Sequence, residues 1–155
     1  FVVPFQDIQF SIRDNCHEMN RIVLYRRMMY RIAHVLAELN NCNGLVTGES
    51  VGQVASQTLK NLAAVSCVTQ MSVFRPLIGM NKHEIILNAK KIGTYDVSIE
   101  VQPDCCSVFM PINPTTRSKI KYLELDEKLF PWEELMAHAL TAVETINLDD
   151  LNSVV

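Results

Sequence analysis

The clearest helical pattern in the chain runs over residues 19–39. Its apolar positions recur every three or four residues, the spacing that places side chains on one face of an α-helix. The members of this apolar face are Ile22, Tyr25, Met29, Ile32, Ala33 and Leu36. We place Arg27, Arg31 and Glu38 on the opposite, solvated face. Arg26 lies on the flank of the apolar face, where its side chain either extends to solvent or reaches a ligand at a sheet edge.

The other elements are arranged around a short apolar segment that runs into a glycine-punctuated turn. Leu45 and Val46 predict a buried strand, because the run is too short and too apolar for a surface strand. Gly48 and Gly52 follow it and predict a sharp turn that a ligand can approach closely. A helix is predicted over residues 54–65, and its free N–H groups favour an anion or nucleotide at the end of the strand. An ordinary β-to-α turn is the alternative.

The rest of the chain continues this alternation of strands and helices. The further predicted elements are strands over residues 1–5 and 73–78, helical character around 8–12, a helix over 82–92, and a last helix over 131–146. Asn81 opens a capping box and Gly93 ends the helix that follows it. Residues 117–122 alternate basic and uncharged side chains, which fits a strand or one helical turn, and residues 147–155 are predicted to be a frayed tail. Short connections between alternating elements predict an α/β fold with a parallel sheet flanked by helices.

Composition narrows the class of protein. The chain has 155 residues, of which 48% are hydrophobic and 20% charged, so we expect one globular domain with a substantial core. The net charge of -3 is not the electrostatic signature of a domain that binds nucleic acid tightly by itself. No apolar run is long enough to cross a membrane, and no signal peptide is present.

The cysteines carry the sharpest chemical signal. They are Cys16, Cys42, Cys67, Cys105 and Cys106. An odd number without a disulfide framework predicts a reducing, cytoplasmic compartment, and neither a Cys-x-x-Cys pair nor a histidine cluster indicates a zinc site. We expect Cys67 to be buried within an apolar element. Cys105 and Cys106 lie instead in a polar loop after Pro103, where an accessible thiol with a lowered pKa acts as a nucleophile; the alternative is that both thiols are incidental.

Three other polar side chains are candidates for binding. Gln53 and Gln57 lie one turn apart in the predicted helix, and the amide of Gln57 suits a nucleobase edge or a phosphate. Solvated helix polarity is the alternative for both. Arg75, within a predicted strand, is placed to pair with a buried carboxylate. The histidines show no spacing that ties them to the cysteine pair, so we interpret them as surface or hydrogen-bonded residues; they are His17, His34, His83 and His138.

Several motifs in order resemble those of one family. They occupy residues 26–29 (RRMM), 46–59 (VTGESVGQVASQTL), 75–77 (RPL), 82–86 (KHEII), 91–94 (KIGT) and 103–106 (PDCC). Together they resemble the tRNA 4-thiouridine synthetase family, also called the thiamine-biosynthesis sulfurtransferase, from residue 1 to about residue 143. The motif at 46–59 is specific to that family. Those at 75–77 and 82–86 are shared more widely among ATP pyrophosphatases that have a PP-loop.

The resemblance implies an adenine-nucleotide hydrolase-like domain, with residues 1–146 as the C-terminal part of a PP-loop ATP pyrophosphatase domain. In that family ATP, with Mg²⁺, adenylates the C4 oxygen of a tRNA uridine, and a persulfide sulfur supplied by a cysteine desulfurase displaces AMP. The same sulfur serves thiazole synthesis for thiamine through a small carrier protein. By motif, the ATP contacts fall on Arg26, Gly48 and Gln57, and the sulfur carrier on Cys106. Cys105 occupies the variable position before it.

The sequence also departs from the family. The Ser-Gly-Gly-x-Asp-Ser type of PP-loop does not occur in these residues, nor do the RNA-binding region and the rhodanese-like extension with its second catalytic cysteine. We therefore expect the C-terminal half of a catalytic domain, inactive alone and self-associating through exposed sheet edges. Sulfur would then come directly from the desulfurase. The alternative is a nucleotide-binding or dimerising module without sulfur chemistry, in which Cys106 is incidental.

Overall fold

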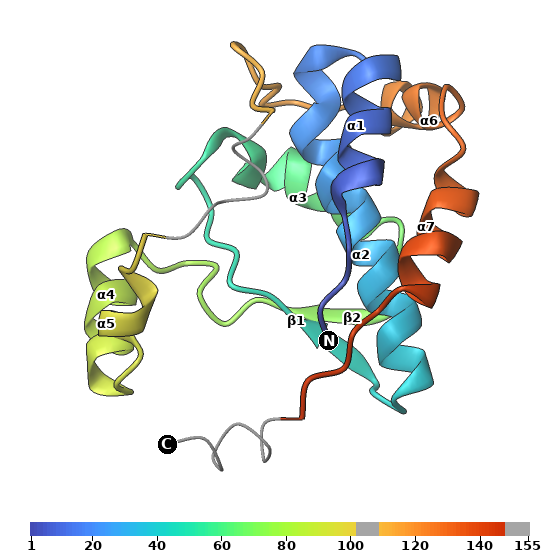
Figure 1. The fold of residues 1–155 in the computed structure, drawn as a ribbon. Coiled ribbons are helices and arrows are strands. Elements are labelled where there is room, and N and C mark those ends of the chain that lie inside the picture. The colour runs from blue at the N-terminus through green and yellow to red at the C-terminus, as the bar shows by residue number, and fades with distance from the viewer. Residues whose placement is uncertain (102–108, 148–155) are drawn as a thin grey trace.

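The computed structural model describes residues 1–101 and 109–147 (Figure 1). Its elements are α1 (Gln6–Asn15), η1 (Glu18–Asn20), α2 (Arg21–Leu39), β1 (Gly44–Val46), η2 (Ala55–Gln57), α3 (Leu59–Ser66), β2 (Ser72–Phe74), α4 (Lys82–Lys91), α5 (Tyr95–Ser98), α6 (Ile120–Glu127) and α7 (Trp132–Thr141). Within these residues, no helix is both long and apolar enough to cross a membrane.

The two strands form a parallel pair, as the sequence predicts. Gly44 lies opposite Ser72 and Val46 opposite Phe74. A Cβ on Gly44 would lie 3.0 Å from both the Phe74 ring and the Ser72 carbonyl oxygen, so glycine allows this close approach of the strands. The expectation that both strands are buried is only half right. Leu45 and Val73 contact the core, whereas Val46 and Phe74 point to the other face of the sheet and are exposed.

The core is built around α2, which lies between α1, α3 and α7 (Figure 1). Its fully buried side chains include Ile12 from α1, Leu24 and Tyr25 from α2, Val65 from α3, and Leu123 from α6. The predicted apolar face of α2 is confirmed at Ile22, Tyr25 and Ile32, but it is wider than predicted. Val23, Leu24 and Met28 are buried as well, because α2 has neighbours on several sides.

The solvated positions predicted for Arg27 and Arg31 are wrong. The Arg27 side chain is buried and forms a bidentate ion pair with Glu127 of α6, with N–O distances of 2.7 and 2.9 Å. Its Nη1 also donates to the carbonyl of Ala64 in α3 at 2.6 Å. Arg31 pairs with the same carboxylate at 2.6 and 2.9 Å, and its guanidinium lies 4.3 Å from the ring centre of Trp132. The face of α2 that carries both arginines is therefore covered by α3, α6 and α7.

Several element boundaries also differ from the sequence predictions. Residues 1–5 do not form a strand; Val2 alone makes an antiparallel bridge with Glu144. The predicted strand 73–78 ends at Phe74, because residues 75–78 turn through a hydrogen bond from the Ile78 N–H to the Arg75 carbonyl. The last helix ends at Thr141, and residues 120–127 are helical. The tail predicted over 147–155 falls almost wholly outside the described residues.

Helices α4 and α5 lie apart from the other helices (Figure 1). The capping box predicted at Asn81 is confirmed: its Oδ1 accepts from the Glu84 N–H at 3.1 Å, and Glu84 accepts from the Asn81 N–H at 2.7 Å. The predicted apolar face of α4 is only half-buried, at Ile85, Ile86 and Ala89, and α4 contributes no buried residue to the core. This pair is thus specified by its own caps and turns more than by packing.

His17 gives this fold a pH-dependent contact. Its Nδ1 lies 2.5 Å from Oδ1 of Asp126, and this hydrogen bond, together with the Asp126 charge, raises the pKa of His17 above its ordinary 6.5. A raised pKa in the folded state means that the stabilisation is complete below the unfolded pKa and is lost as pH rises through the folded one. We expect His17→Gln to destabilise the full-length gene product at about pH 5.5 and to have no effect at about pH 9. Urea denaturation at both pH values measures this, with His83→Gln as the exposed control, and an equal effect at the two pH values would contradict it.

Candidate functional site

A buried carboxylate organises the carboxyl ends of the two strands. Glu49, in the turn after β1, is 4% exposed. Its Oε2 accepts hydrogen bonds from the Tyr30 hydroxyl at 2.8 Å and the Thr47 hydroxyl at 3.1 Å. The same carboxylate forms ion pairs with Arg75 at 2.5 Å and with Arg26. A charge taken out of water in this way is tolerated because each oxygen is in an ion pair with an arginine and Oε2 is hydrogen-bonded as well.

Arg75 fulfils the prediction that it pairs with a buried carboxylate. Besides Glu49, its Nη2 donates to the Ser66 hydroxyl at 2.5 Å and to the Tyr30 hydroxyl at 3.2 Å. Arg75 therefore joins the end of β2 to α2 and α3. Glu49 is not among the residues predicted as this partner. A sequence signal for it exists, because Glu49 is the only charged residue in the turn that follows β1.

Arg26 reaches the turn rather than solvent. Its side chain is 12% exposed, and besides Glu49 it binds the Ser56 carbonyl, to which Nη1 donates at 3.1 Å. One guanidinium on α2 thus holds both the beginning and the end of the segment between β1 and α3. The alternative in which Arg26 extends to solvent is therefore wrong, and its contact with a ligand at the sheet edge stays a prediction.

The two glycines of the turn have different roles. Gly52 has a φ of +79°, a backbone conformation that side chains other than glycine rarely adopt. Gly48 has no such requirement, but it is exposed and a Cβ there would meet no atom within 4 Å. Its backbone is therefore open to a ligand. The turn is fixed to the segment after β2 by bonds from the Val51 N–H to the Ile78 carbonyl at 3.1 Å and from the Ser50 hydroxyl to the Met80 carbonyl at 2.7 Å.

The predicted helix over 54–65 is wrong at its start. Ala55–Gln57 form the short 3₁₀ turn η2, and α3 begins at Leu59, where the Thr58 hydroxyl accepts from the Asn61 N–H at 3.2 Å. Threonine is a preferred N-cap, and it ends the extended segment and starts the helix here. The N-terminus of α3 is therefore capped by a side chain of the protein itself. Gln57 lies before the helix, and Gln53 is not one helical turn from it.

Gln57 links the end of the turn to its beginning by two hydrogen bonds. Its side-chain Oε1 accepts from the Ser50 N–H at 3.3 Å, and its carbonyl accepts from the Gly52 N–H at 3.2 Å. The amide nitrogen has no hydrogen-bond partner among residues 1–101 and 109–147. Gly48 and Gln57 thus belong to one structured turn, which Arg26 of α2 holds from a distant position in the sequence.

The predicted sulfur carrier Cys106, with Cys105, lies outside the described residues. Of the other cysteines, Cys16 is buried, and its burial raises its pKa to about 12, so it remains a neutral thiol at physiological pH. The prediction that Cys67 is buried is wrong, because it occupies the C-cap of α3 and is exposed; its sulfur still accepts from Arg27 Nη1 at 3.2 Å.

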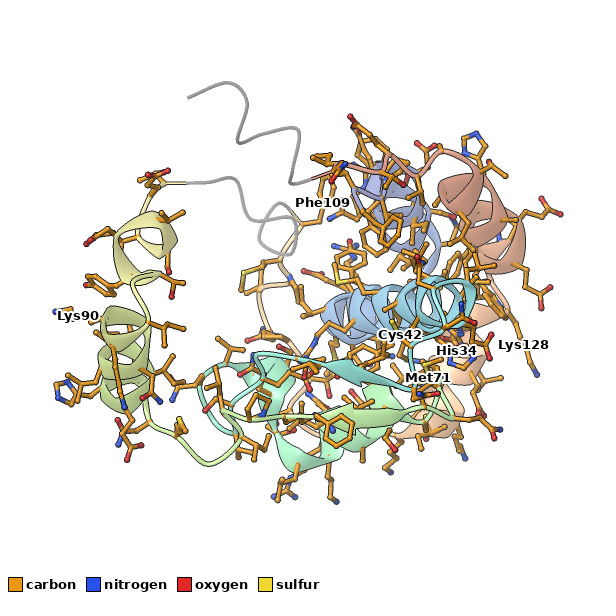
Figure 2. The ribbon with its side chains drawn as sticks, turned by 90° about the horizontal axis from the view of Figure 1, so that it is seen from below. His34, Cys42, Met71, Lys90, Phe109 and Lys128 are labelled. Carbon is orange, nitrogen blue, oxygen red and sulfur yellow. The ribbon has the colours of Figure 1, made fainter. Side chains whose placement is uncertain are left out.

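Another exposed thiol lies at the opposite edge of the sheet. Cys42, His34 and Met71 line a cavity of about 580 Å³ where β1 and β2 begin (Figure 2). His34 is hydrogen-bonded to the Thr69 hydroxyl at 2.9 Å. Within the described part of the chain, no three His, Cys, Asp or Glu side chains are grouped so that they could hold a metal ion.

Comparison with known proteins identifies the family of this chain. A family model described as "Thiamine biosynthesis protein (ThiI)" matches residues 1–130. The chain belongs to the ThiI family. A probable tRNA sulfurtransferase from Acetivibrio thermocellus is 44% identical over 147 residues, which cover 95% of this chain and 38% of that protein. One from Thermus thermophilus is 45% identical over 145 residues, or 94% of this chain and 36% of that protein.

A solved structure shows the same fold. The crystal structure of a 4-thiouridine synthetase–RNA complex with bound ATP superimposes with a TM-score of 0.83 at 40% identity, over 90% of this chain and 36% of that chain. The resemblance to the family and the predicted α/β fold with a parallel sheet and flanking helices are therefore confirmed. This ThiI chain spans little more than a third of the length of the relatives it matches.

Proposed function

We propose that this chain is part of the catalytic domain of an ATP-dependent tRNA sulfurtransferase that forms 4-thiouridine. The observation that carries the proposal is the turn held by Glu49, which presents the open backbone of Gly48 at the carboxyl end of a parallel strand. Ligands of open α/β sheets bind at this edge. A relative of this chain with 40% identity was solved with ATP and RNA bound.

The turn supplies the groups that a nucleotide needs. The backbone at Gly48 is accessible, and the Gln57 amide nitrogen is a donor for a nucleobase or a phosphate. Arg26 contributes a positive charge and, through its bonds to Glu49 and Ser56, holds the turn in place. Such preorganised donors stabilise the charge that develops on phosphates during adenylation. We expect Mg²⁺ to accompany the ATP phosphates. Because Glu49, the buried carboxylate of the turn, is already paired with two arginines, we assign no metal ligand to the described residues.

The sulfur chemistry is proposed for Cys106. ATP reacts with the C4 oxygen of a tRNA uridine, and pyrophosphate leaves. The terminal sulfur of a persulfide on Cys106, supplied by a cysteine desulfurase, attacks C4 and displaces AMP. A second thiol then attacks the Cys106 sulfur, which breaks the S–S bond, releases 4-thiouridine and leaves a disulfide on Cys106. A thiol reductant restores the starting state.

The family to which the chain belongs also favours a second destination for the sulfur. Because the family model is named for thiamine biosynthesis, we propose that the same persulfide is passed to a small carrier protein for thiazole synthesis. Both destinations use the same sulfur on Cys106 and differ only in the acceptor.

The proposal is tested with the full-length gene product, an unmodified tRNA transcript, ATP, ³⁵S-cysteine and a cysteine desulfurase. The expected result is ³⁵S in 4-thiouridine after nuclease digestion, formed only when ATP and desulfurase are both present, with one AMP released for each sulfur incorporated. If ATP binds but no thiolated nucleoside forms with any tRNA, the alternative of a nucleotide-binding module without sulfur chemistry is correct.

Arg26→Ala is expected to raise the Kd for ATP at least about tenfold. The change removes a charge-assisted partner of buried Glu49 and the bond to the Ser56 carbonyl, so the turn loses its anchor on α2. Isothermal titration of the full-length gene product with ATP measures it. Arg26→Lys should restore only part of the affinity, since an ammonium does not reproduce the guanidinium fork. Lys128→Ala, an exposed site after α6 (Figure 2), is the control, and an unchanged Kd in Arg26→Ala would remove Arg26 from the site.

A further inference from the structure

A cavity of about 300 Å³ lies where η1 meets the strip 115–119 and the start of α6. The alternating basic residues Arg117 and Lys119, which the sequence analysis left without a role, line it together with the ring of Tyr122. The volume is at the lower end of the range for small-ligand pockets, about 300–1,000 Å³, which suits one nucleotide.

The charge at the cavity is positive despite the acidic side chain in its wall. Asp126 is 1% exposed, and its carboxylate is compensated by His17 at 2.5 Å and by the Asn20 amide at 2.7 Å. Arg117 and Lys119 are exposed, and the structure gives neither of them a carboxylate partner within residues 1–101 and 109–147. A phosphate at this rim would therefore meet two cations that no carboxylate of the described residues pairs with.

The cavity also offers apolar surface beside these cations. Tyr122 is 48% exposed and Met19 is 56% exposed, although both line the cavity. The Lys119 ammonium lies 5.7 Å from the centre of the Tyr122 ring, so charge and aromatic surface adjoin. Unpaired bases stack on aromatic side chains in this kind of setting, while inorganic anions gain nothing from the apolar part.

The cavity wall is fixed to the candidate ATP site by hydrogen bonds, most of which involve the buried Asn61. Asn61 is fully buried, and its Nδ2 donates to the carbonyls of Ala55 at 3.0 Å and Thr115 at 2.8 Å. Its Oδ1 accepts from the Ser118 N–H at 2.9 Å, and the Thr58 hydroxyl donates to the Thr116 carbonyl at 2.7 Å. The strip 115–118 and the end of the turn that carries Gln57 thus form one connected unit at the start of α3.

We propose that this cavity binds one nucleotide of the RNA substrate, with its phosphate on Arg117 and Lys119 and its base against Tyr122. The inference rests on the proposed function, because it assigns part of the tRNA contact to the catalytic domain itself. A nucleotide seated here is oriented relative to the ATP turn through Asn61. The cavity therefore positions the RNA strand for adenylation.

The test is binding of an unmodified tRNA transcript to the full-length gene product, measured by filter binding over a range of salt concentrations. Arg117→Ala with Lys119→Ala should raise the Kd at least about tenfold and reduce the slope of log K against log salt by about 1, since one phosphate contact contributes about 0.7–0.9. Tyr122→Ala should raise the Kd at least about fivefold without changing that slope. Lys90→Ala with Lys91→Ala, an equal change of charge on α4, is the control and should stay within about twofold of wild type.

The outcomes separate this proposal from the proposed function. Wild-type protein that thiolates tRNA, combined with Arg117 and Lys119 variants that bind RNA no worse than the α4 control, overturns the cavity assignment alone. Equal loss of ATP or inorganic phosphate binding in those variants also overturns it, because the cavity would then be a general anion site. Wild-type protein that binds ATP but forms no 4-thiouridine refutes the proposed function instead. Circular dichroism confirms that the exposed substitutions leave the fold intact.

Discussion

Cys106→Ser is expected to reduce 4-thiouridine formation by at least about a thousandfold, the scale on which removal of a catalytic nucleophile acts. A serine hydroxyl does not accept a persulfide sulfur, so adenylated tRNA would form with no sulfur to displace AMP. Cys105→Ser is the matched control one residue away and should stay within about fivefold of wild type. The measurement is ³⁵S incorporation from cysteine with the desulfurase present.

Persulfide labelling of the protein itself gives a second readout of the same prediction. Wild-type and Cys105→Ser proteins should carry ³⁵S that a thiol reductant removes, and Cys106→Ser should carry none. The tRNA is expected to bind Cys106→Ser with unchanged affinity, which separates loss of chemistry from loss of folding. Full labelling and full thiolation in Cys106→Ser would show that another cysteine carries the sulfur.

Glu127→Ala is expected to lower the free energy of unfolding by about 3–5 kcal/mol, because it removes the carboxylate that two arginines share. Arg27 is buried, and Arg31 is largely covered. Both would retain a charge without its partner inside the junction of α2, α3 and α6. Urea denaturation of the full-length gene product, followed by circular dichroism, measures the loss. Glu124→Ala on the exposed side of α6 is the control and should change the stability by less than about 0.5 kcal/mol.

The pH dependence checks the origin of this stabilisation. Burial by itself raises the pKa of Glu127, but the hydrogen bonds and charges of Arg27 and Arg31 outweigh it, so the pKa lies below the ordinary 4.5. A lowered pKa in the folded state gives stability that is present above the unfolded pKa and is lost as pH falls through the folded one. The difference between wild type and Glu127→Gln should therefore shrink below about pH 4.5. A difference that is independent of pH would mean that packing, and not charge, carries the effect.

The candidate site illustrates which residues a sequence can supply. The motifs that resemble one family predict Arg26, Gly48 and Gln57 together. Each also has a local signal: Arg26 lies on the flank of an apolar helix face, Gly48 lies in a turn after a short apolar strand, and Gln57 carries an amide. Glu49, which organises the turn, is not among the predicted residues. Its partners Arg26, Tyr30 and Arg75 come from other elements, and no local pattern indicates which distant arginine will share a given carboxylate.

The pattern of apolar and polar residues was sufficient for the parallel pairing of β1 and β2, the long helix α2, and the capping box of α4, because each depends on periodicity or on neighbours within a few positions. It was not sufficient for Arg27 and Arg31. A charged residue on the outer side of a helix predicts a solvated face only if no other helix covers it, and here α3, α6 and α7 do. The joining of Arg26 to the turn, and of the 115–118 strip to α3 through Asn61, was likewise decided by the tertiary structure. Contacts between positions so far apart in sequence depend on how the helices pack, and that packing is set by the whole core at once.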